Sequence, residues 1–128
     1  MKKAVSLMMA AAMTMGLAAC GSTASTDTAA SADLLSQIRE RGTITVAMEG
    51  TWAPWTYHDE NDNLVGYDVE VATEIAKKLG VEPQFVEGEW DGLLAGLDAG
   101  RYDIMVNGVD ITEERAEKYD FSEPYAYN

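Results

Sequence analysis

The sequence predicts an α/β domain in which a parallel sheet is flanked by helices. Between about residues 33 and 128, runs rich in β-branched residues alternate with amphipathic helical patterns. This alternation is typical of parallel strand pairing. The region is also long enough to bury one modest hydrophobic core. We therefore expect one folded domain, preceded by residues 1–32, whose composition is different.

The first three elements are predicted from apolar spacing and turn residues. Residues 32–42 (ADLLSQIRERG) place leucine and isoleucine at helical spacing and end at Gly42, which predicts a short amphipathic helix. Residues 43–48 (TITVAM) are rich in β-branched residues and predict a strand. Residues 50–68 contain Pro54 and a cluster of polar residues, which predicts a loop with a small hairpin.

The next helix has the clearest pattern in the chain. Residues 68–80 (DVEVATEIAKKLG) repeat apolar residues at helical spacing, with two lysines in the last turn and Gly80 at the end. Asp68 is predicted to cap the amino end of this helix. Glu70 adds negative charge near the positive end of the helix dipole.

The remaining elements continue the alternation. We expect two further strands and two further helices, over residues 82–88 (EPQFVEG), 90–100 (WDGLLAGLDAG), 102–108 (YDIMVNG) and 112–119 (TEERAEKY). The last helix opens on Thr112, and extended chain follows over residues 120–128.

Residues 1–19 have the pattern of a secretory signal peptide. Two lysines precede an uncharged run, from Ala4 to Ala19, that ends in small residues. A buried core helix is the alternative, and the run is shorter than the roughly 20 residues that span a bilayer. Cys20, the only cysteine, completes the tetrapeptide LAAC, which resembles a lipobox and implies cleavage before Cys20 and lipid attachment to it.

An ordinary free thiol is the alternative for that cysteine. The residues that follow it, 21–32, are nearly all Gly, Ser, Thr and Ala. Such a segment buries too little apolar surface to order itself, so we expect a flexible tether over residues 20–32.

The charge of the chain argues against a nucleic-acid partner. It has 22 acidic and 9 basic residues, and removal of Lys2 and Lys3 with a signal peptide would leave a net charge of 7 − 22 = −15. Binding to a phosphate backbone depends on clustered lysine and arginine. A high net charge also favours a soluble monomer.

Four segments are predicted to meet at one edge of the sheet. Right-handed crossovers place the carboxyl ends of parallel strands on the same edge, and ligands of open α/β sheets bind there. The segments are residues 49–57, 88–91, 107–110 and the start of the 112–119 helix.

All three tryptophans and Tyr57 fall in or beside these segments. Trp52, Trp55 and Trp90 would supply the aromatic lining that is usual for a small-molecule site, and a ring face can also hold an ammonium group. Packing in the core is the alternative, and it is open in particular for Trp90, which also fits the apolar face of its helix.

Arg115 lies three residues after Thr112, in the first turn of a predicted helix. The helix dipole disfavours a cation there. The position is explained if the guanidinium and the free backbone N–H groups hold an anion such as a carboxylate. The alternative, which side-chain chemistry alone favours, is an exposed ion pair with Glu113, Glu114 or Asp91.

Two acidic residues are candidates for the same site. Asp110 directly precedes the predicted helix and could take a ligand ammonium group, or it could simply complement the dipole. Glu49 ends the first strand and could meet a polar or cationic ligand side chain, or remain solvated.

The sequence contains no motif for catalysis or for a metal. His58 is the sole histidine, and the chain has no CxxC, GxSxG or phosphate-loop pattern. Residues 59–70 match several positions of a calcium loop, but Leu64 stands where the sharp turn needs glycine. We therefore expect no enzyme activity, no cofactor and no metal, and a solvated turn in the hairpin.

From about Arg41 to Tyr127 the chain resembles the bacterial extracellular solute-binding proteins of family 3, the polar amino-acid-binding family. The resemblance rests on residues 52–80 (WAPWTYHDENDNLVGYDVEVATEIAKKLG) and 90–125 (WDGLLAGLDAGRYDIMVNGVDITEERAEKYDFSEPY). These contain the family's Gly-aromatic-Asp helix start and its Ile-Thr-x-x-Arg to Phe-Ser-x-Pro-Tyr signature.

The resemblance implies a type II periplasmic-binding-protein-like fold. Members of the family are two-lobed receptors that close on an amino acid and deliver it to an ABC transporter permease. Residues 33–128 then supply the N-terminal part of the solute-binding domain, an incomplete first lobe that stops before the second. We expect an exported monomer, lipid-anchored to the cell membrane and facing the outside or the periplasm.

The resemblance also implies the ligand-binding residues. They are Glu49, Trp52, Trp90, Asn107, Gly108, Val109, Asp110 and Arg115, with Arg115 binding the α-carboxylate of the ligand. Asp110 departs from the family, in which many members have Ser or Thr. The two acids favour a polar or cationic amino acid, although three tryptophans would also suit an apolar one.

Two other functions occur on the same fold. One is the ligand-binding domain of a signalling receptor, which a downstream transmembrane segment would identify. The other is an enzyme similar to cyclohexadienyl dehydratase, which uses a carboxylate in the cleft.

Overall fold

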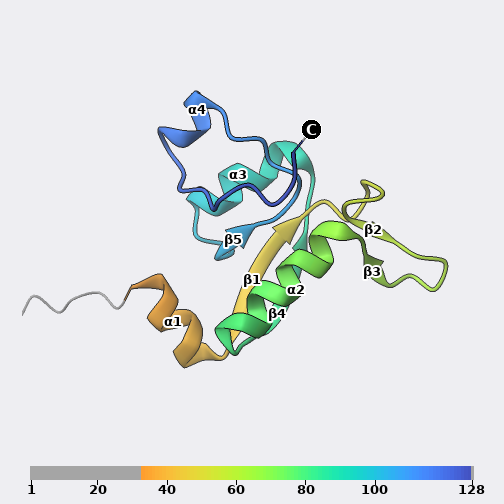
Figure 1. Cartoon of the computed structure of the whole chain (residues 1–128), viewed down its shortest axis with the longest axis horizontal. Coiled ribbons are helices and arrows are strands. Elements are labelled where there is room, and N and C mark those ends of the chain that lie inside the picture. The colour runs from red at the N-terminus through yellow and green to blue at the C-terminus, as the bar shows by residue number, and fades with distance from the viewer. Residues whose placement is uncertain (1–32, 128) are drawn as a thin grey trace, which may run out of the picture. The chain divides into compact units, whose positions relative to one another are not determined.

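A computed structural model describes residues 33–127. The predicted signal peptide, Cys20 and the predicted tether lie outside the described residues, as does residue 128. The helices and strands alternate as the sequence predicts (Figure 1). In chain order they are α1 (Leu34–Arg41), β1 (Thr43–Met48), β2 (Tyr57–His58), β3 (Leu64–Val65), α2 (Tyr67–Leu79), β4 (Glu82–Glu87), α3 (Trp90–Asp98), β5 (Ile104–Met105) and α4 (Glu113–Ala116).

The main sheet has β1 at its centre. The strand order is β4-β1-β5, and β1 pairs in parallel with both neighbours, so Val46 lies between Phe85 and Ile104. The predicted parallel α/β arrangement is therefore confirmed. β2 and β3 form the small antiparallel hairpin that was expected between residues 50 and 68.

The strand expected over residues 102–108 is shorter in the structure. β5 contains only Ile104 and Met105. After it, the backbone N–H of Val106 still bonds to Ala47 O at 3.0 Å, but the next donor on β1's side, Glu49 N, is taken by the side chain of Asn107 at 2.8 Å. A side chain replaces the backbone acceptor at this point, so the ladder ends where the site begins.

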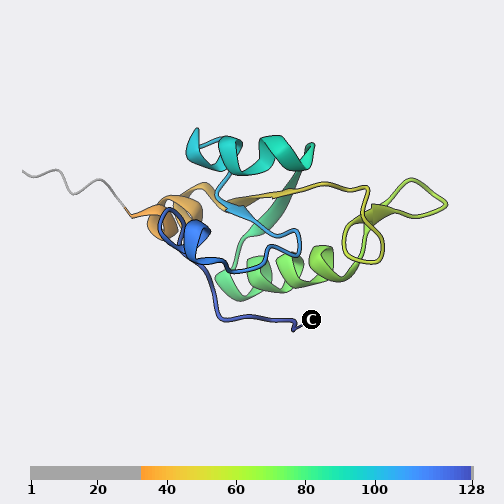
Figure 2. The same ribbon diagram turned by 90° about the horizontal axis from the view of Figure 1, so that it is seen from above.

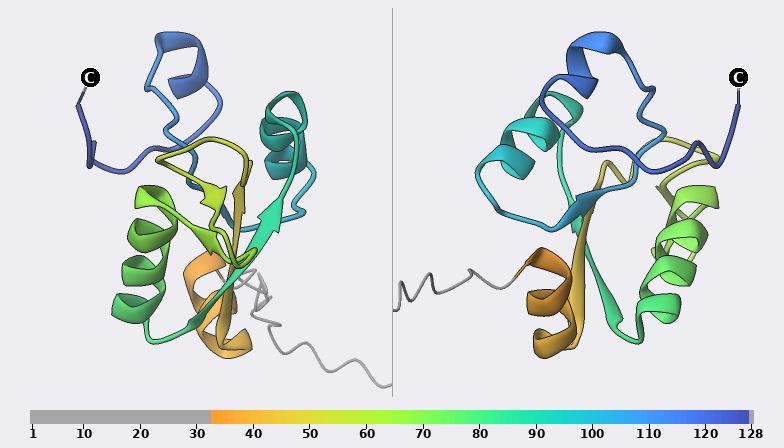
Figure 3. Two further views of the ribbon diagram at one scale, coloured as in Figure 1. Left: turned by 90° about the vertical axis from the view of Figure 1, so that its right-hand side faces the viewer. Right: turned by 60° about the vertical axis from the view of Figure 1, so that its left-hand side comes forward.

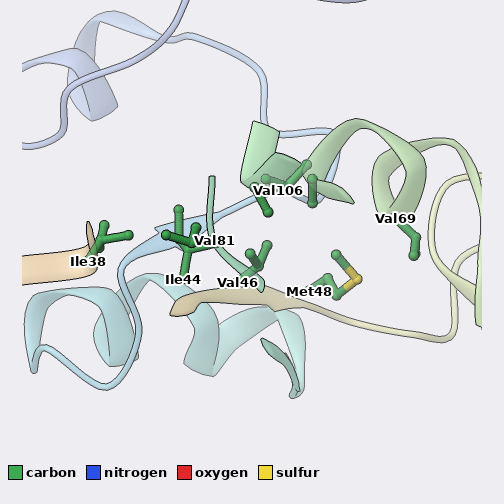
Figure 4. Close-up of a cluster of buried hydrophobic side chains, with 9 residues drawn as sticks. Ile38, Ile44, Val46, Met48, Val69, Val81 and Val106 are labelled. Atoms are coloured by element: carbon green, nitrogen blue, oxygen red, sulfur yellow. The ribbon is translucent and has the colours of Figure 1, made fainter. Parts of the chain in front are cut away.

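Helices cover both faces of the sheet. α2 and α3 lie on opposite sides of it (Figures 2 and 3). Alternate residues of β1 serve the two faces, as a strand's period of two requires. Ile44, Val46 and Met48 join the core cluster that includes Ala72 of α2, as Figure 4 shows for the strand residues.

Ala47 lies on the opposite face of the sheet. It packs with Leu93 of α3 and with Tyr102, and all three side chains are buried. The two clusters fix α2 and α3 against β1, and the loops that leave the carboxyl ends of the strands are thereby held above the same edge.

The amino end of α2 differs from the prediction. The helix begins at Tyr67, and its N-cap residue is Gly66 instead of Asp68. Gly66 has φ 130°, and a Cβ there would collide with the Trp55 carbonyl, so glycine is required by both backbone and packing. Asp68 therefore lies inside the first turn, fully buried. The predicted end at Gly80 is confirmed, with φ 76° in the left-handed region.

The last helix is a single turn. The hydroxyl oxygen of Thr112 accepts from Arg115 N at 3.2 Å, so the predicted opening on Thr112 is confirmed, but α4 ends at Ala116 instead of Tyr119. The Tyr119 hydroxyl donates to Asp98 at 2.9 Å, which ties the chain after α4 to the end of α3.

The final segment runs across the molecule toward α2 (Figure 3). Its Tyr125 hydroxyl donates to Asp68 Oδ1 at 3.0 Å. None of the helices between residues 33 and 127 combines the length and apolar composition that crossing a bilayer requires.

Candidate functional site

An open pocket of ≈ 460 Å³ lies where the loops leave the carboxyl ends of the strands. All four predicted segments contribute to its wall, so their expected convergence is confirmed. The lining residues are Glu49, Thr51, Trp52, Trp90, Asn107, Gly108, Asp110 and Arg115. The volume suits a small polar molecule.

Two residues distinguish this lining from the set expected from the sequence. Val109 is not among the lining residues, and Thr51 is. Thr51 belongs to the loop that follows β1, so its position in the chain was the only signal that could have pointed to it.

Arg115 supplies the positive charge of the pocket. Its Nη1 donates to the backbone carbonyl of Asp110 at 2.9 Å, and its Cζ lies 5.5 Å from the centroid of the Trp90 ring. Among residues 33–127 the ion pairs within 4.0 Å join Arg41 to Asp103, His58 to Glu87 and Lys77 to Glu74. The alternative of an ion pair between Arg115 and a nearby carboxylate is therefore wrong.

The half-buried guanidinium is thus held by a carbonyl and by a ring face. Neither contact neutralises its charge. Its remaining N–H groups leave a planar fork, which is the geometry that matches a carboxylate.

Trp90 lies at the wall of the pocket, not in the core. Its side chain is 37% exposed at the first position of α3, whereas Leu93, one turn later, is buried. The choice that the sequence left open for Trp90 is settled by this geometry in favour of the pocket.

Trp52 packs directly on the backbone of Gly108. The Gly108 φ is 55°, and a Cβ added there would lie 2.6 Å from Trp52 Cζ3. The loop that carries Trp52 is closed by a hydrogen bond of 2.6 Å from its own N–H to Thr56 O. Glycine at 108 therefore permits the indole to form the wall.

The third tryptophan, Trp55, is not among the residues that line the pocket. Trp55 lies 5.9 Å from Trp52 between ring centroids and meets Tyr67 edge-on at 5.5 Å. Neither Trp55 nor Tyr57 lines the pocket, so the expectation that all these aromatic residues gather there is correct only for Trp52 and Trp90.

Glu49 is held by the side chain of Asn107. The Asn107 Oδ1 accepts from Glu49 N at 2.8 Å, and its Nδ2 donates to Glu49 Oε2 at 2.8 Å. The hydroxyl of Thr56 also donates to Asn107 Oδ1, at 3.4 Å, and accepts from Gly50 N at 3.1 Å. Sequence reasoning missed Thr56, because nothing local marks a residue whose partner lies 51 positions away.

Asp110 was expected either to take a ligand ammonium group or to complement the dipole of the last helix, and the structure adds a role for its backbone. Its side chain is exposed, and its backbone carbonyl is the group that holds Arg115. Asp110 is one of the lining residues, so its carboxylate adds negative charge to the pocket.

A buried carboxylate, that of Asp68, lies close to Gly108. Asp68 Oδ2 is 3.9 Å from the position a Gly108 Cβ would take, and it has no hydrogen-bond partner among the described residues. Burial raises the pKa of Asp68, although the hydrogen bond from the Tyr125 hydroxyl opposes the rise. The pKa of Tyr125 is also raised, by burial and by the neighbouring Asp68 charge.

The pocket therefore presents one cation, two carboxylates and two indoles. This set is complementary to a zwitterion, whose carboxylate and ammonium need opposite charges at separate points. Within residues 33–127 no group of three or more His, Cys, Asp or Glu side chains is arranged to hold a metal ion.

Two of the curated proteins similar to this chain are named as L-cystine-binding proteins. The chain is 46% identical to the L-cystine-binding protein TcyA of Bacillus subtilis (strain 168), over 98% of this chain and 48% of that protein. It is 47% identical to the L-cystine-binding protein TcyJ of Escherichia coli (strain K12), over 72% of this chain and 35% of that protein. The chain thus spans less than half the length of these curated relatives.

Solved structures share the fold at substantial identity. The unliganded open L-cystine solute receptor of Neisseria gonorrhoeae matches with a TM-score of 0.68 and 52% identity, over 72% of this chain and 40% of that chain. The arginine-bound form of domain 1 from TmArgBP matches with a TM-score of 0.68 and 42% identity, over 70% of this chain and 71% of that chain.

An enzyme also lies among the structural relatives. An ancestral cyclohexadienyl dehydratase, AncCDT-3(P188L), matches with a TM-score of 0.69 and 42% identity, over 73% of this chain and 39% of that chain. The curated relatives named above are binding proteins.

The family model of the bacterial extracellular solute-binding proteins, family 3, matches residues 44–128. That range contains every residue that lines the pocket. The chain belongs to the bacterial extracellular solute-binding proteins of family 3.

Proposed function

We propose that this chain forms part of an extracellular receptor that binds an amino acid and delivers it to an ABC transporter permease. The observation that carries the proposal is the state of Arg115. Its guanidinium lines the pocket, lies over Trp90 and has no carboxylate partner among residues 33–127. An unneutralised, half-buried guanidinium favours an anionic group from outside the chain.

The geometry supports one orientation of an amino acid. The α-carboxylate binds the Arg115 fork, and the ammonium group lies toward the Asp110 carboxylate. The ligand side chain then extends between Trp52 and Trp90 toward Glu49. Each charged group of the ligand meets the opposite charge in this orientation.

A polar amino acid is the ligand class that this pocket favours. Glu49 supplies an acceptor beyond the indoles, which suits a ligand whose side chain carries its own amino group. Relatives are named for L-cystine, and a related single domain is arginine-bound. Both ligands have a second cationic group, so L-cystine and arginine are the first ligands to test.

Calorimetric titration of the full chain tests the proposal. The ligands are the twenty amino acids and L-cystine, and the variants are Arg115→Ala and the control Arg101→Ala, at an exposed arginine after α3. We expect Arg115→Ala to weaken binding by about 100-fold, since charge-assisted hydrogen bonds contribute about 1.5–3 kcal/mol each. Unchanged affinity in Arg115→Ala would remove this residue from the site.

We further propose that the protein is exported and anchored through a lipid on Cys20, as a monomer. The proposal is supported by the signal-peptide pattern and by LAAC. Mass spectrometry of the membrane-associated protein should find cleavage before Cys20 and acyl chains on it. A Cys20→Ser variant should lose the lipid and leave the membrane fraction.

A dehydratase is the second candidate, because an ancestral cyclohexadienyl dehydratase shares the fold at 42% identity. Glu49 and Asp110 are the carboxylates in the pocket. Turnover of a prephenate-like substrate that is lost in Glu49→Gln, together with no amino-acid binding, would favour the enzyme over the receptor.

A further inference from the structure

We infer that Asn107 and Thr56 are positioning residues that aim the Glu49 carboxylate into the pocket and so set the preference for a ligand with a second cationic group. The inference rests on the proposed function, since it concerns how an amino acid is chosen. Asn107 then acts through Glu49, without offering its own side chain to the ligand.

The burial and bonding of Asn107 carry the first step. Its side chain is fully buried, and both ends of its amide are engaged. Nδ2 bonds to the Glu49 carboxylate, and Oδ1 accepts from the Glu49 backbone N–H, each at 2.8 Å. The Asn107 amide therefore bonds to Glu49 at two points, the backbone N–H and the carboxylate.

The chemistry of the partners fixes the orientation of the amide. Oδ1 faces two donors, the Glu49 N–H and the Thr56 hydroxyl. A flipped amide would set its NH₂ group against a backbone N–H and its oxygen against a carboxylate, two repulsive contacts in a buried place. Only the orientation that donates to Glu49 satisfies every group.

Thr56 completes this arrangement. Its hydroxyl oxygen accepts from Gly50 N at 3.1 Å, so its proton is free to point to Asn107 Oδ1. Thr56 is itself fully buried. The hydroxyl thus joins the backbone directly after Glu49 to the amide that holds Glu49, and the two ends of the loop are fixed together.

The consequence concerns the free oxygen of Glu49. Oε2 is occupied by Asn107, and the structure describes no hydrogen bond to Oε1 within residues 33–127, while Glu49 lines the pocket. Holding a long side chain in one rotamer before the ligand arrives removes an entropic cost from binding. The gain is specific to ligands whose cationic group reaches that oxygen.

Asparagine-to-aspartate exchange tests the inference. Asn107→Asp places a carboxylate against Glu49 and should turn Glu49 out of the pocket. We expect the affinity for arginine or L-cystine to fall by about tenfold more than the affinity for a neutral amino acid, since losing a charge-assisted hydrogen bond costs about one factor of ten or more.

A matched control exists in the hairpin turn. Asn63 Nδ2 also donates to a carboxylate, that of Asp59, at 3.1 and 3.2 Å, but the pair is exposed and does not line the pocket. Asn63→Asp introduces the same like-charge contact and should leave the ratio of the two affinities unchanged.

A double variant that restores a donor and an acceptor between positions 49 and 107 distinguishes a positioning role of Asn107 from an effect on folding. In Glu49→Gln with Asn107→Asp, the new amide can donate to the new carboxylate, so the melting temperature lost in Asn107→Asp should return. The double variant should show the weak preference of Glu49→Gln alone. If Asn107→Asp does not fold, Thr56→Val with Thr56→Ser as its rescue gives the same test, because serine keeps the hydroxyl.

The outcomes are distinct. A wild-type chain that binds no amino acid overturns the proposed function, and the specificity claim with it. A chain that binds amino acids but keeps its preference in Asn107→Asp, or in Glu49→Gln, overturns only the inference. Side-chain amide resonances of Asn107 in the ligand-free chain should shift in Glu49→Gln and not in the exposed control Glu82→Gln; equal spectra would also overturn it.

Discussion

Two carboxylates of the domain, Asp103 and Asp68, show how its two ends differ. Asp103 lies before β5, at the amino-terminal side of the sheet, and its Oδ2 accepts from Thr45 N, the Thr45 hydroxyl and Arg41 Nη2 at 2.8, 2.8 and 2.5 Å. Asp68 lies at the pocket side, where Oδ1 has Tyr125 and Oδ2 has no partner among the described residues.

The pKa shifts of the two groups follow from these contacts. Burial opposes ionisation of Asp103, but the hydrogen bonds from Thr45 and Arg41 outweigh it, and the pKa is lowered. Burial dominates at Asp68, and the pKa is raised.

The comparison of Asp103 with Asp68 shows at which end of the sheet polar groups have more hydrogen-bond partners. At the amino-terminal side the half-buried Asp103 carboxylate accepts three hydrogen bonds, which stabilises the fold. At the pocket side the charges of Arg115 and Asp68 are left incompletely compensated, as is common where a site must receive a ligand. The stabilising contacts of Asp103 and the candidate site thus lie at opposite ends of the same three strands.

The largest expected effect on stability is at Asp103. Asp103→Ala removes three hydrogen bonds and leaves the Thr45 N–H and the Arg41 guanidinium without this acceptor, so the free energy of unfolding should fall by about 3 kcal/mol. Urea denaturation measures it. Glu74→Ala, at an exposed pair with Lys77, is the control and should cost below about 1 kcal/mol.

The difference in stability between wild type and Asp103→Ala should depend on pH. Because the folded pKa of Asp103 lies below its ordinary value, its stabilising contribution is fully present above an unfolded pKa of about 3.9 and is lost as the pH falls through the lowered folded pKa. A gap between wild type and Asp103→Ala that stays constant down to acid pH would contradict this account.

An intermediate effect is expected at Gly108. Alanine there must adopt φ 55°, and its Cβ would lie 2.6 Å from Trp52 Cζ3, so the indole ring must move. The substitution should cost about 2 kcal/mol of stability and lower amino-acid affinity. Gly80→Ala isolates the backbone part, because φ is 76° and no atom lies within 4 Å of the added Cβ. It should cost about 1 kcal/mol and leave affinity unchanged. Equal losses in the two variants would show that Trp52 is not constrained by Gly108.

The smallest effect is expected at Asp68. Asp68→Asn keeps an acceptor for Tyr125 and removes a buried charge whose pKa is raised, so stability at neutral pH should change by less than about 1 kcal/mol, toward greater stability. Wild type should gain stability as the pH falls through the raised folded pKa toward about 3.9, and the variant should lack that gain. Calorimetric melting between pH 4 and about 8 checks both statements. A loss as large as that of Asp103→Ala would remove the contrast between the two ends.

The order of the elements and the location of the site could be predicted from the sequence. Apolar spacing predicted the first three helices and Thr112 predicted the start of the last one, and the topology of parallel strands predicted that Glu49, Trp90 and Arg115 lie at one edge. The local pattern was sufficient because Glu49 directly follows β1, Trp90 opens α3 and Arg115 lies in the single turn of α4.

Features that depend on distant partners could not be predicted. Asp68 was expected as a cap, yet Gly66 takes that role because of a close approach to Trp55, and Asp68 turns to Tyr125, 57 residues away. Likewise, Thr56 has the composition of an ordinary loop residue, and only its contact with Asn107 gives it a role.

The central position of β1 also has a consequence for how the protein folds. Glu49 and Asn107, which meet across the carboxyl end of β1, are separated by 58 residues in the chain. Such long loops must close before the pocket forms, and non-local closure is the slow part of folding. Acquisition of ligand affinity during refolding should therefore lag behind the appearance of helical signal, and its rate would report the arrival of the last strand.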